Sequence, residues 1–260
     1  MATYDAILPA GGRISPPFSL QAGVDSKALI NFDGQTILAR TLNALADCGQ
    51  IGRTVLIGTP EVLAHKDAAL ASYNIEAGVS LPENLFRALD FLFKSGSITG
   101  RVVVVPTDIP FLTGGIIEKY LNMVPKDKDI LVPLVQRHEF EERFPGSEST
   151  FVDLKGGSFT LGGMFLMEPN ALQKSRPYIE RVIEQRKSKM GMAKLLGPVF
   201  VAKWLSKQMT LADVEKKIQS MLHISGSAVL GVPPELAYDI DDQVDYDYAI
   251  GLIKQKVSTT

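Results

Sequence analysis

The sequence predicts an α/β protein of three layers (α/β/α), with helices on both faces of a mostly parallel central sheet. In the first half, short apolar segments alternate with longer amphipathic ones, as strand–helix repeats require. Residues 102–105 are all valine, and such a β-branched run is typical of a strand buried on both faces of a parallel sheet. From 169 to 222 the pattern is almost entirely helical, which predicts a C-terminal helical insertion or lid. We expect a single domain over residues 1–260.

The first half supplies the strand–helix repeats. Residues 4–8 are an apolar strand, and the stretch 9–26, rich in Gly, Pro and Ser, is a loop. A helix over 36–45 places Ile37, Thr41 and Leu45 on one face. The remaining predicted elements are strands over 53–58, around Ile75, over 102–105 and over 129–135, and helices over 60–73, 82–94 and 115–123. Pro60 opens the second helix, because proline fits the first helical position.

The second half is less regular. Residues 151–153 and 162–167 resemble short strands, and a late strand is expected over 228–230. A closing helix is expected over 242–256. The sequence shows no linker, repeat or low-complexity segment between these elements, which is why the helical stretch is interpreted as an insertion.

Composition excludes several classes of function. The chain has 260 residues, 45% hydrophobic and 22% charged, the balance of a globular protein with a sizeable core. The net charge of −2 gives no basic field, so neither nucleic acid nor a membrane is an expected partner. The single cysteine, Cys48, excludes an internal disulfide and is expected only to pack. No signal-peptide pattern and no membrane-length apolar run are present, so we expect a cytoplasmic location.

A glycine pair follows the first strand, in the segment Leu8-Pro9-Ala10-Gly11-Gly12. Ligands bind at the carboxyl ends of strands in open α/β sheets, and paired glycines let backbone N–H groups approach phosphate oxygens. A plain tight turn is the alternative. The motifs G-x-G-x-x-G and G-x-x-x-x-G-K-[ST] are both missing, which argues against a Rossmann dehydrogenase and a P-loop kinase.

Lys27 closes the long loop that follows the glycines. From this position its ammonium group can reach back over a triphosphate and neutralise part of its charge. The alternative is a solvated surface lysine, which is the commoner role of a lone lysine.

Asp108 follows the four-valine strand, directly after Pro106 and Thr107. A carboxylate at the end of a buried strand needs solvent, a cation or hydrogen-bond donors, because burying it unpaired is costly. Mg²⁺ takes one or two carboxylates together with substrate phosphates, which suits Asp108. The alternative is an aspartate that caps the next helix.

Carboxylates cluster again near the C-terminus, where the sequence reads Tyr-Asp-Ile-Asp-Asp. Asp239 and Asp241 point to the same side if this stretch is extended. Clustered carboxylates repel one another unless a metal ion or a basic group holds them. Asp242 and Asp245 fit a different role, as the cap and first turn of the closing helix, where the helix dipole favours negative charge.

These motifs occur together and in order: L-P-A-G-G, a lysine before an apolar pair, F-D-G-Q-T-I-L, P-T-D-I-P-F-L and D-I-D-D. The set resembles the MobA-like NTP transferase family, over residues 4–167 and 226–255. Molybdenum-cofactor guanylyltransferases and the cytidylyltransferases of isoprenoid synthesis are similar relatives. The resemblance implies the GT-A-like, Rossmann-like nucleotidyltransferase fold.

The resemblance also implies roles for individual residues. Lys27 and Asp108 would be catalytic, and Asp108 and Asp241 would bind Mg²⁺, with Asp239 competing for the second place. The implied nucleotide-binding residues are Leu8, Pro9, Ala10, Gly11, Gly12, Arg13, Lys27, Asn84 and Thr107. Arg13 follows Gly12 directly, whereas relatives carry their arginine a few residues later.

On the acceptor side, Gly162 and Gly163 resemble a G-G-N segment that borders the acceptor in relatives, with Met164 in place of the asparagine. The helical stretch 169–222 adds a cluster of cations, of which Arg186 is the expected acceptor ligand because arginine binds phosphate and carboxylate in a bidentate manner. The alternative is that these cations form the solvated face of an amphipathic helix.

The predicted function is Mg²⁺-dependent transfer of a nucleoside monophosphate from an NTP to a small phosphorylated acceptor, with release of pyrophosphate. A monomer or a homodimer is expected. Two alternatives stay open. One is a GT-A-type glycosyltransferase, for which Asp239-Ile240-Asp241 has the D-x-D spelling. The other is a non-catalytic nucleotide-binding module, which the altered arginine position would suit.

Overall fold

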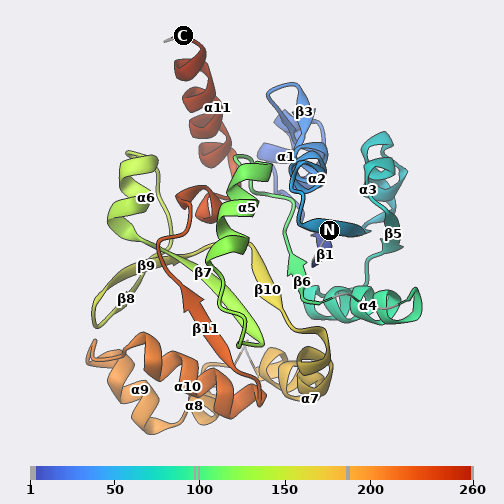
Figure 1. Cartoon of the computed structure of the whole chain (residues 1–260). Coiled ribbons are helices and arrows are strands. Elements are labelled where there is room, and N and C mark those ends of the chain that lie inside the picture. Colours follow the sequence, from blue (N-terminus) through green and yellow to red (C-terminus); the bar gives the residue numbers. More distant parts are fainter. Residues whose placement is uncertain (1–3, 97, 99, 186–187, 259–260) are drawn as a thin grey trace.

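The computed structural model describes residues 4–96, 98, 100–185 and 188–258, and Figure 1 shows how their elements are arranged. The centre is a nine-stranded sheet in the order β5-β4-β1-β6-β10-β7-β9-β8, with β11 (Gly226–Val229) paired to β7. Strands β2 (Asn31–Phe32) and β3 (Gln35–Thr36) form a separate small hairpin. The predicted α/β architecture is confirmed.

The first half of the sheet is parallel. Strand β1 (Tyr4–Ala10) lies between β4 (Ile51–Gly58) and β6 (Val102–Val104) and pairs with both in parallel. Strand β5 (Tyr73–Glu76) extends this parallel set beyond β4. The connecting helices are α2 (Ile37–Asp47), α3 (Pro60–Ala64) and α4 (Leu81–Lys94). The predicted strand–helix repeats of this half are confirmed.

The second half of the sheet is mixed. Strand β10 (Phe165–Met167) is antiparallel to both β6 and β7 (Ile130–Gln136). On the other side of β7, β9 (Gly157–Leu161) and β8 (Val152–Leu154) add antiparallel strands. Only β11 is parallel to β7 among the strands described there. The sheet is therefore parallel around β1 and antiparallel towards its far edge.

Helices cover both faces of the sheet. The alternate valines of β6 belong to different cores: Val103 joins a cluster with α2 and α5 (Gly114–Met123), and Val102 and Val104 join a cluster with α4 and α7 (Pro169–Gln185). The remaining helices are α1 (Phe18–Ala22), α6 (Arg137–Arg143), α8 (Lys189–Leu196), α9 (Pro198–Leu205), α10 (Leu211–Leu222) and α11 (Gln243–Ser258). Short 3₁₀ turns cover Lys27–Leu29, Lys66–Leu70 and Pro234–Ala237. The valine run was therefore correctly interpreted as a strand buried on both faces.

Several predicted bounds are wrong. The helix expected over 60–73 ends at Ala64, because His65 caps a new turn by accepting a hydrogen bond at Nδ1 from the Asp67 N–H (3.3 Å). The strand expected over 162–167 begins only at Phe165. Its two glycines turn away, since the Gly162 N–H binds the Pro133 carbonyl and the Gly163 N–H binds the Leu236 carbonyl.

Two helices occur where none was predicted. Helix α1 lies inside the loop 9–26, and α6 follows β7 directly. The helical stretch 169–222 is divided among α7, α8, α9 and α10. In the part of the chain that is described, none of the helices has both the length and the apolar character needed to cross a membrane.

Candidate active site

The glycine loop leaves the sheet at the carboxyl end of β1, between its two parallel neighbours. The long loop after it folds back on itself, because Arg13 and Ser26 form an antiparallel bridge and the Ile14 N–H donates to the Asp25 carbonyl (2.9 Å). The Lys27 N–H then donates to the Gly12 carbonyl (3.0 Å). Lys27 therefore returns to the glycines, as the sequence predicted.

The side chains of Lys27 and Asn84 lie against the two glycines of the loop. A Cβ atom on Gly12 would lie 3.4 Å from the Lys27 Cδ, so the lysine side chain crosses directly over this residue. A Cβ atom on Gly11 would lie 3.7 Å from the Asn84 Nδ2. The loop is therefore flanked by a cation on one side and an amide on the other, with its backbone exposed between them.

The other expected nucleotide contacts differ in what they can offer. The side chains of Leu8 and Ala10 are buried in the core, so only their backbone faces the loop. Thr107 is buried, and its hydroxyl donates to the Pro9 carbonyl at 3.5 Å. Asn84 is also buried, and its Oδ1 accepts from the Gly78 N–H at 2.6 Å. Asn84 thus fixes the turn before α4, while Arg13 is exposed.

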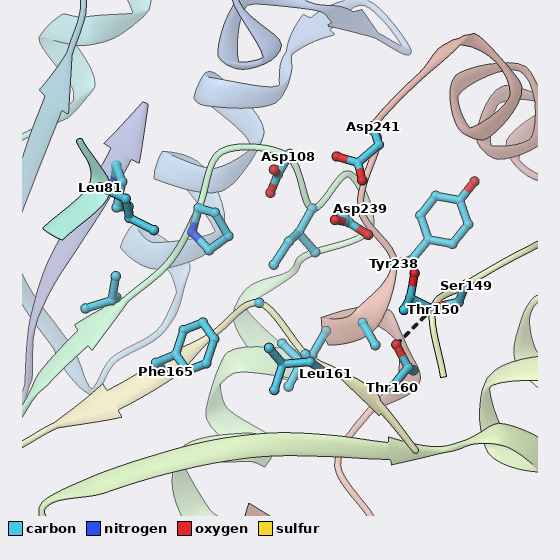
Figure 2. Close-up of a pocket in the computed structure, with 18 of the residues that line it drawn as sticks. Leu81, Asp108, Ser149, Thr150, Thr160, Leu161, Phe165, Tyr238, Asp239 and Asp241 are labelled. Carbon is cyan, nitrogen blue, oxygen red and sulfur yellow. Dashed lines mark hydrogen bonds between the residues drawn. The ribbon is translucent and has the colours of Figure 1, made fainter. Parts of the chain in front are cut away.

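Asp108 meets the C-terminal carboxylates through a backbone bond. The Ile240 N–H donates to the Asp108 carbonyl at 3.0 Å, and Ile240 is fully buried. Because Ile240 is anchored inward, Asp239 and Asp241 on either side of it are both held near Asp108 (Figure 2). One carboxylate oxygen from each of the three residues lies within 4.8 Å of the others. We call this group the acidic triad.

The neighbouring acidic residues serve the helix instead. Asp242 Oδ1 accepts from the N–H groups of Val244 (2.8 Å) and Asp245 (3.2 Å). Asp245 Oδ2 in turn accepts from the N–H groups of Asp241 (2.9 Å) and Asp242 (3.2 Å). This reciprocal cap satisfies the first turn of α11. The sequence-based division, with Asp242 and Asp245 as caps, is confirmed.

Lys27 is the counter-charge of the acidic triad. Its Nζ lies 3.6 Å from Asp108 Oδ2 and donates a hydrogen bond to Asp241 Oδ1. Burial lowers the pKa of Lys27, but the hydrogen bond to Asp241 and the charges of Asp108, Asp241 and Asp239 outweigh it, so its pKa is raised. Lys27 is therefore held in its charged form, and the surface-lysine alternative does not fit its position.

The triad carboxyl groups carry more negative charge than Lys27 balances. Burial raises the pKa of Asp108, and Asp241 adds to this, although Lys27 lowers it. Burial also raises the pKa of Asp239 to about 6, with further contributions from the charges of Asp108 and Asp241. Convergent carboxylates that repel one another are stabilised by a divalent cation. Oxygen donors of this kind suit Mg²⁺, so the donor set fits such an ion.

A cleft of about 880 Å³ opens beside the triad and runs over β10 and β9. Gly162 and Gly163, the expected acceptor-side residues, both line it. A Cβ atom on Gly163 would lie only 2.7 Å from the Ile109 Cδ1, so this glycine lets β10 approach the loop that carries Asp108. Arg186, the other expected acceptor ligand, lies outside the described residues.

Sequence reasoning missed most of the cleft wall. Leu161 and Phe165 lie on its floor, and Thr160 binds Ser149 through their hydroxyl oxygens at 2.9 Å (Figure 2). The short strands that carry these residues have no distinctive pattern of their own. The glycine pair between β9 and β10 was the one available signal: the resemblance assigned it to the acceptor side, although the pair was also interpreted as part of a strand, which begins only at Phe165.

Known proteins share this fold. A structure described as a hypothetical transferase from Thermus thermophilus has a TM-score of 0.82 and 30% identity, with 95% of this chain and 100% of that chain covered. A 4-diphosphocytidyl-2C-methyl-D-erythritol synthase from Anaerococcus prevotii has a TM-score of 0.59 and 11% identity over 97% of this chain and 96% of that chain. A 2-C-methyl-D-erythritol 4-phosphate cytidylyltransferase from Thermus thermophilus has a TM-score of 0.54 and 16% identity, covering 98% and 100%. The last two likenesses show the fold alone. No match was found among curated proteins.

The model of the MobA-like NTP transferase domain matches residues 6–223, which include most of β1, the glycine loop, Lys27 and Asp108. The resemblance stated from the motifs is confirmed, and so is the Rossmann-like nucleotidyltransferase fold. The match supports a transferase enzyme of the nucleotidyl-transfer class. The chain belongs to the MobA-like NTP transferase family.

Proposed function

We propose that this protein transfers a nucleoside monophosphate from an NTP to a small acceptor, in a Mg²⁺-dependent reaction that releases pyrophosphate. The observation that carries this proposal is the position of the acidic triad and Lys27 beside the glycine loop, at the carboxyl end of β1 and β6. An open α/β sheet binds its ligands at this edge. The arrangement supplies carboxylates for a metal ion and the Lys27 ammonium group for the triphosphate.

In the proposed reaction the residues of the site position the two substrates and neutralise the negative charge of the triphosphate. An oxygen of the acceptor attacks the α-phosphorus, the bond from that phosphorus to the oxygen bridging to the β-phosphorus breaks, and pyrophosphate leaves with the electron pair. Backbone N–H groups of the glycine loop hold the triphosphate, and Lys27 balances the charge that builds up on the leaving group. A phosphate acceptor is already ionised at neutral pH, so this step requires no general base.

Mg²⁺, when bound, would neutralise the phosphate oxygens around the reacting phosphorus. Asp108 and Asp241 are the proposed ligands, and Asp239 is the alternative to Asp241. The Ile240 N–H donates a hydrogen bond to the Asp108 carbonyl, which holds the loop after β6 against the segment 239–241. Lys27, which binds Asp108 and Asp241 here, is proposed to turn towards the triphosphate when the nucleotide enters, because its flexible side chain already crosses Gly12.

The proposed nucleotide site comprises residues that surround the glycine loop: Leu8, Pro9, Ala10, Gly11, Gly12, Arg13, Lys27, Asn84 and Thr107. Leu8 and Ala10 would contribute backbone groups only, because their side chains are buried. Asn84 would act partly by shaping the turn at Gly78. On the acceptor side we propose Gly162, Gly163 and Arg186, with a phosphate as the reacting group of the acceptor.

The helical segment 169–222 is proposed to be an insertion that borders the acceptor side. Helix α7 packs against the same face of the sheet as α4, and Ile179 of α7 lines the cleft. Gln173 Nε2 donates to Asp90 Oδ1 (2.6 Å), which ties α7 to α4. Ile179 is the sole cleft-lining residue contributed by the described part of this segment.

The experiment that tests the function separates binding from turnover. Calorimetric titration of the four α,β-methylene NTP analogues, with Mg²⁺ and with EDTA, should show binding that requires Mg²⁺ and favours one base. Pyrophosphate release from the matching NTP should then depend on an added small-molecule fraction that supplies the acceptor. If a panel of nucleotide diphosphate sugars bound instead of NTPs, the glycosyltransferase alternative would replace this proposal. Mg²⁺-dependent NTP binding without pyrophosphate release under any condition would favour the non-catalytic module.

A further inference from the structure

The cleft next to the acidic triad has an apolar floor and rim. Leu81 and Leu85 come from α4, Phe165 and Met167 from β10, and Ile179 from α7. Leu161 continues the surface on β9 (Figure 2). These residues come from separate parts of the chain, so the apolar surface is a product of the fold and not of one hydrophobic segment.

Part of this surface is open to solvent. The side chain of Leu81 is 62% exposed and that of Leu161 is 55% exposed. Single exposed leucines are ordinary on protein surfaces, but these lie in one concave site together with partly buried apolar neighbours. A concave, mainly apolar surface with a few convergent polar groups at one end is the usual form of a small-molecule site. The polar groups here are the carboxylates of the triad.

The charged side chains that line the described part of the cleft are all acidic. Among the cleft residues that the structure describes there are six acidic side chains and no lysine, arginine or histidine: Asp108, Glu148, Asp239, Asp241, Asp242 and Asp245. An anionic group placed over β9 or β10, away from the triad and Lys27, would therefore meet apolar carbon and the Glu148 carboxylate, with no cation among the described cleft residues to balance its charge. Like charges facing each other across a binding surface oppose binding and so select against such ligands.

Apart from its carboxylates, the cleft offers a sugar few hydrogen-bonding side chains: the hydroxyl groups of Ser149, Thr150, Thr160 and Tyr238. Ser149 and Thr160 bind each other through their hydroxyl oxygens at 2.9 Å, so one of the two hydroxyl donors is already used. A polyhydroxylated ligand needs many donors and acceptors from its site, because polar groups that lose water without replacement partners cost free energy. The floor of leucine, phenylalanine and methionine side chains does not supply them.

We propose that the acceptor is an amphiphile: its phosphate or hydroxyl lies at the acidic triad, and its body is an uncharged aliphatic or aromatic group that lies on Leu81, Leu161 and Phe165. This inference rests on the proposed function for the position of the reacting group, and on the cleft alone for the nature of the body. It distinguishes this acceptor from a compact sugar phosphate, which would expose hydroxyl groups to an apolar floor.

The test uses an uncharged apolar probe and two phosphates with the same head group. N-phenyl-1-naphthylamine fluoresces more strongly in an apolar site, so its binding can be followed without turnover. With Mg²⁺ and the α,β-methylene NTP present, we expect n-octyl phosphate to displace the probe at a concentration at least about tenfold lower than glycerol phosphate does. Pyrophosphate release from the NTP is measured in parallel with each phosphate.

Matched variants locate the probe. Leu161→Gln and Leu81→Gln should each weaken probe binding about five- to tenfold, because each replaces apolar contact with an amide. Leu70→Gln is the control, since Leu70 is 51% exposed and does not line the cleft; its probe affinity should stay within about twofold.

The outcomes separate this inference from the proposed function. Probe binding that depends on Leu161, together with the preference for n-octyl phosphate, supports the apolar body even if no pyrophosphate is released, in which case the transfer reaction is the part that fails. Unchanged probe affinity in both variants, or equal binding of the two phosphates, overturns the inference while leaving transfer intact. If sedimentation showed that Leu161→Gln dissociates a dimer, the cleft would belong to a second copy of the chain, and the inference would also be overturned.

Discussion

The two halves of the sheet differ in construction and in what they bring to the site. Strands β5, β4, β1 and β6 run parallel, and the glycine loop and Asp108 leave the carboxyl end of two of them. Strands β10, β9 and β8 are antiparallel additions around β7, with a glycine pair between β9 and β10. The carboxyl edge of the first half, joined there by Asp239 and Asp241 from the segment before α11, concentrates charge, and the second half presents most of a shaped, mainly apolar surface.

This difference suggests that the reaction centre and the choice of acceptor are supplied by separate structures. Right-handed βαβ connections bring the carboxyl ends of parallel strands to one edge of the sheet. Charged residues that follow these strands are therefore brought together by the topology itself. The antiparallel half can vary in strand length and loop position without moving the edge. Changes to charge in the first half should therefore cost most of the activity, while changes to shape in the second half should cost less.

The largest loss is expected for Asp108→Ala. This change removes a triad carboxylate at the end of β6, and we expect pyrophosphate release to fall about 100- to 1,000-fold, as when one preorganised electrostatic group is lost from an active site. The melting temperature should not fall, because the carboxyl group is held in a position that raises its pKa. Asp242→Asn is the control: asparagine caps helices as well as aspartate does, so activity should stay within about threefold. Near-normal turnover of Asp108→Ala would show that charge at this edge is not catalytic.

Lys27→Met is expected to be nearly as damaging, by a different route. Methionine keeps the apolar stem that crosses Gly12 but removes the ammonium group that faces Asp108 and Asp241. We expect weaker binding of the triphosphate and slower transfer, together about 2.7–4 kcal/mol in transition-state stabilisation. Titration of the NTP analogue and single-turnover kinetics measure the two parts. A loss below about threefold would return Lys27 to the role of a surface charge.

Gly163→Ala tests whether the packing of the second half of the sheet against the Asp108 loop affects activity. The new Cβ atom would lie 2.7 Å from the Ile109 Cδ1 and 3.1 Å from the Pro106 Cγ, so it would push on the loop that carries Asp108. We expect about a tenfold loss of activity and a destabilisation of about 1–3 kcal/mol. The double variant with Ile109→Val, which removes the crowded methyl group, should recover part of both. Gly115→Ala is the control, because nothing lies within 4 Å of the added atom; equal effects of the two single variants would contradict the packing argument.

The smallest effect is expected for Asp239→Asn, as a change in melting temperature. The pKa of Asp239 is raised to about 6 from its usual 3.8, so above pH 6 its ionised form is less favourable in the folded state than in the unfolded one. The variant should therefore melt about 1–2 °C higher than the wild type at pH 7.5, a small shift because the side chain is partly exposed and screened. The gain should shrink as the pH falls from about 6 towards 4, because the wild type then takes up the proton in the folded state.

The same variant tests whether the triad binds a cation. Mg²⁺ should raise the melting temperature of the wild type and have little effect on Asp239→Asn, if Asp239 contributes to the ion site. An unchanged melting temperature in the variant at every pH would contradict the repulsion argued for the triad. If Mg²⁺ raised the melting temperatures of the wild type and of Asp239→Asn equally, Asp108 and Asp241 would be the ligand pair.

The sequence predicted the first half of the sheet better than the second, because local sequence patterns determine more of the first half. The four valines and the aspartate after them fixed a buried strand and a polar residue at its end, because a local pattern determines both. The sequence also indicated that Lys27 returns to the glycine loop, because Lys27 closes the same loop that begins at these glycines. The meeting of Asp108 with Asp239 depends on the Ile240 N–H, a contact between distant segments that no local pattern records.

The second half was predicted less well because its elements are short. Strands β9 and β10 are separated by Gly162 and Gly163, whose close approach to Pro133 and Ile109 cannot be seen in the sequence. Helix α6 escaped prediction because its residues are mostly charged and only Phe140 is buried. Its reciprocal cap between Gln136 and Glu139 was a signal that could have found it. The apolar cleft had no signal at all, since its residues come from separate elements.

The central claim, that the acidic triad holds a divalent cation beside the glycine loop, is tested most directly by anomalous diffraction from crystals grown with Mn²⁺ and an α,β-methylene NTP. We predict an anomalous peak within about 2.0–2.4 Å of a carboxylate oxygen of Asp108 and of Asp241 or Asp239, with the Lys27 ammonium turned towards the phosphates. A peak at another place on the protein, or bound nucleotide with Lys27 still paired to Asp241 and no peak at the triad, would contradict the claim.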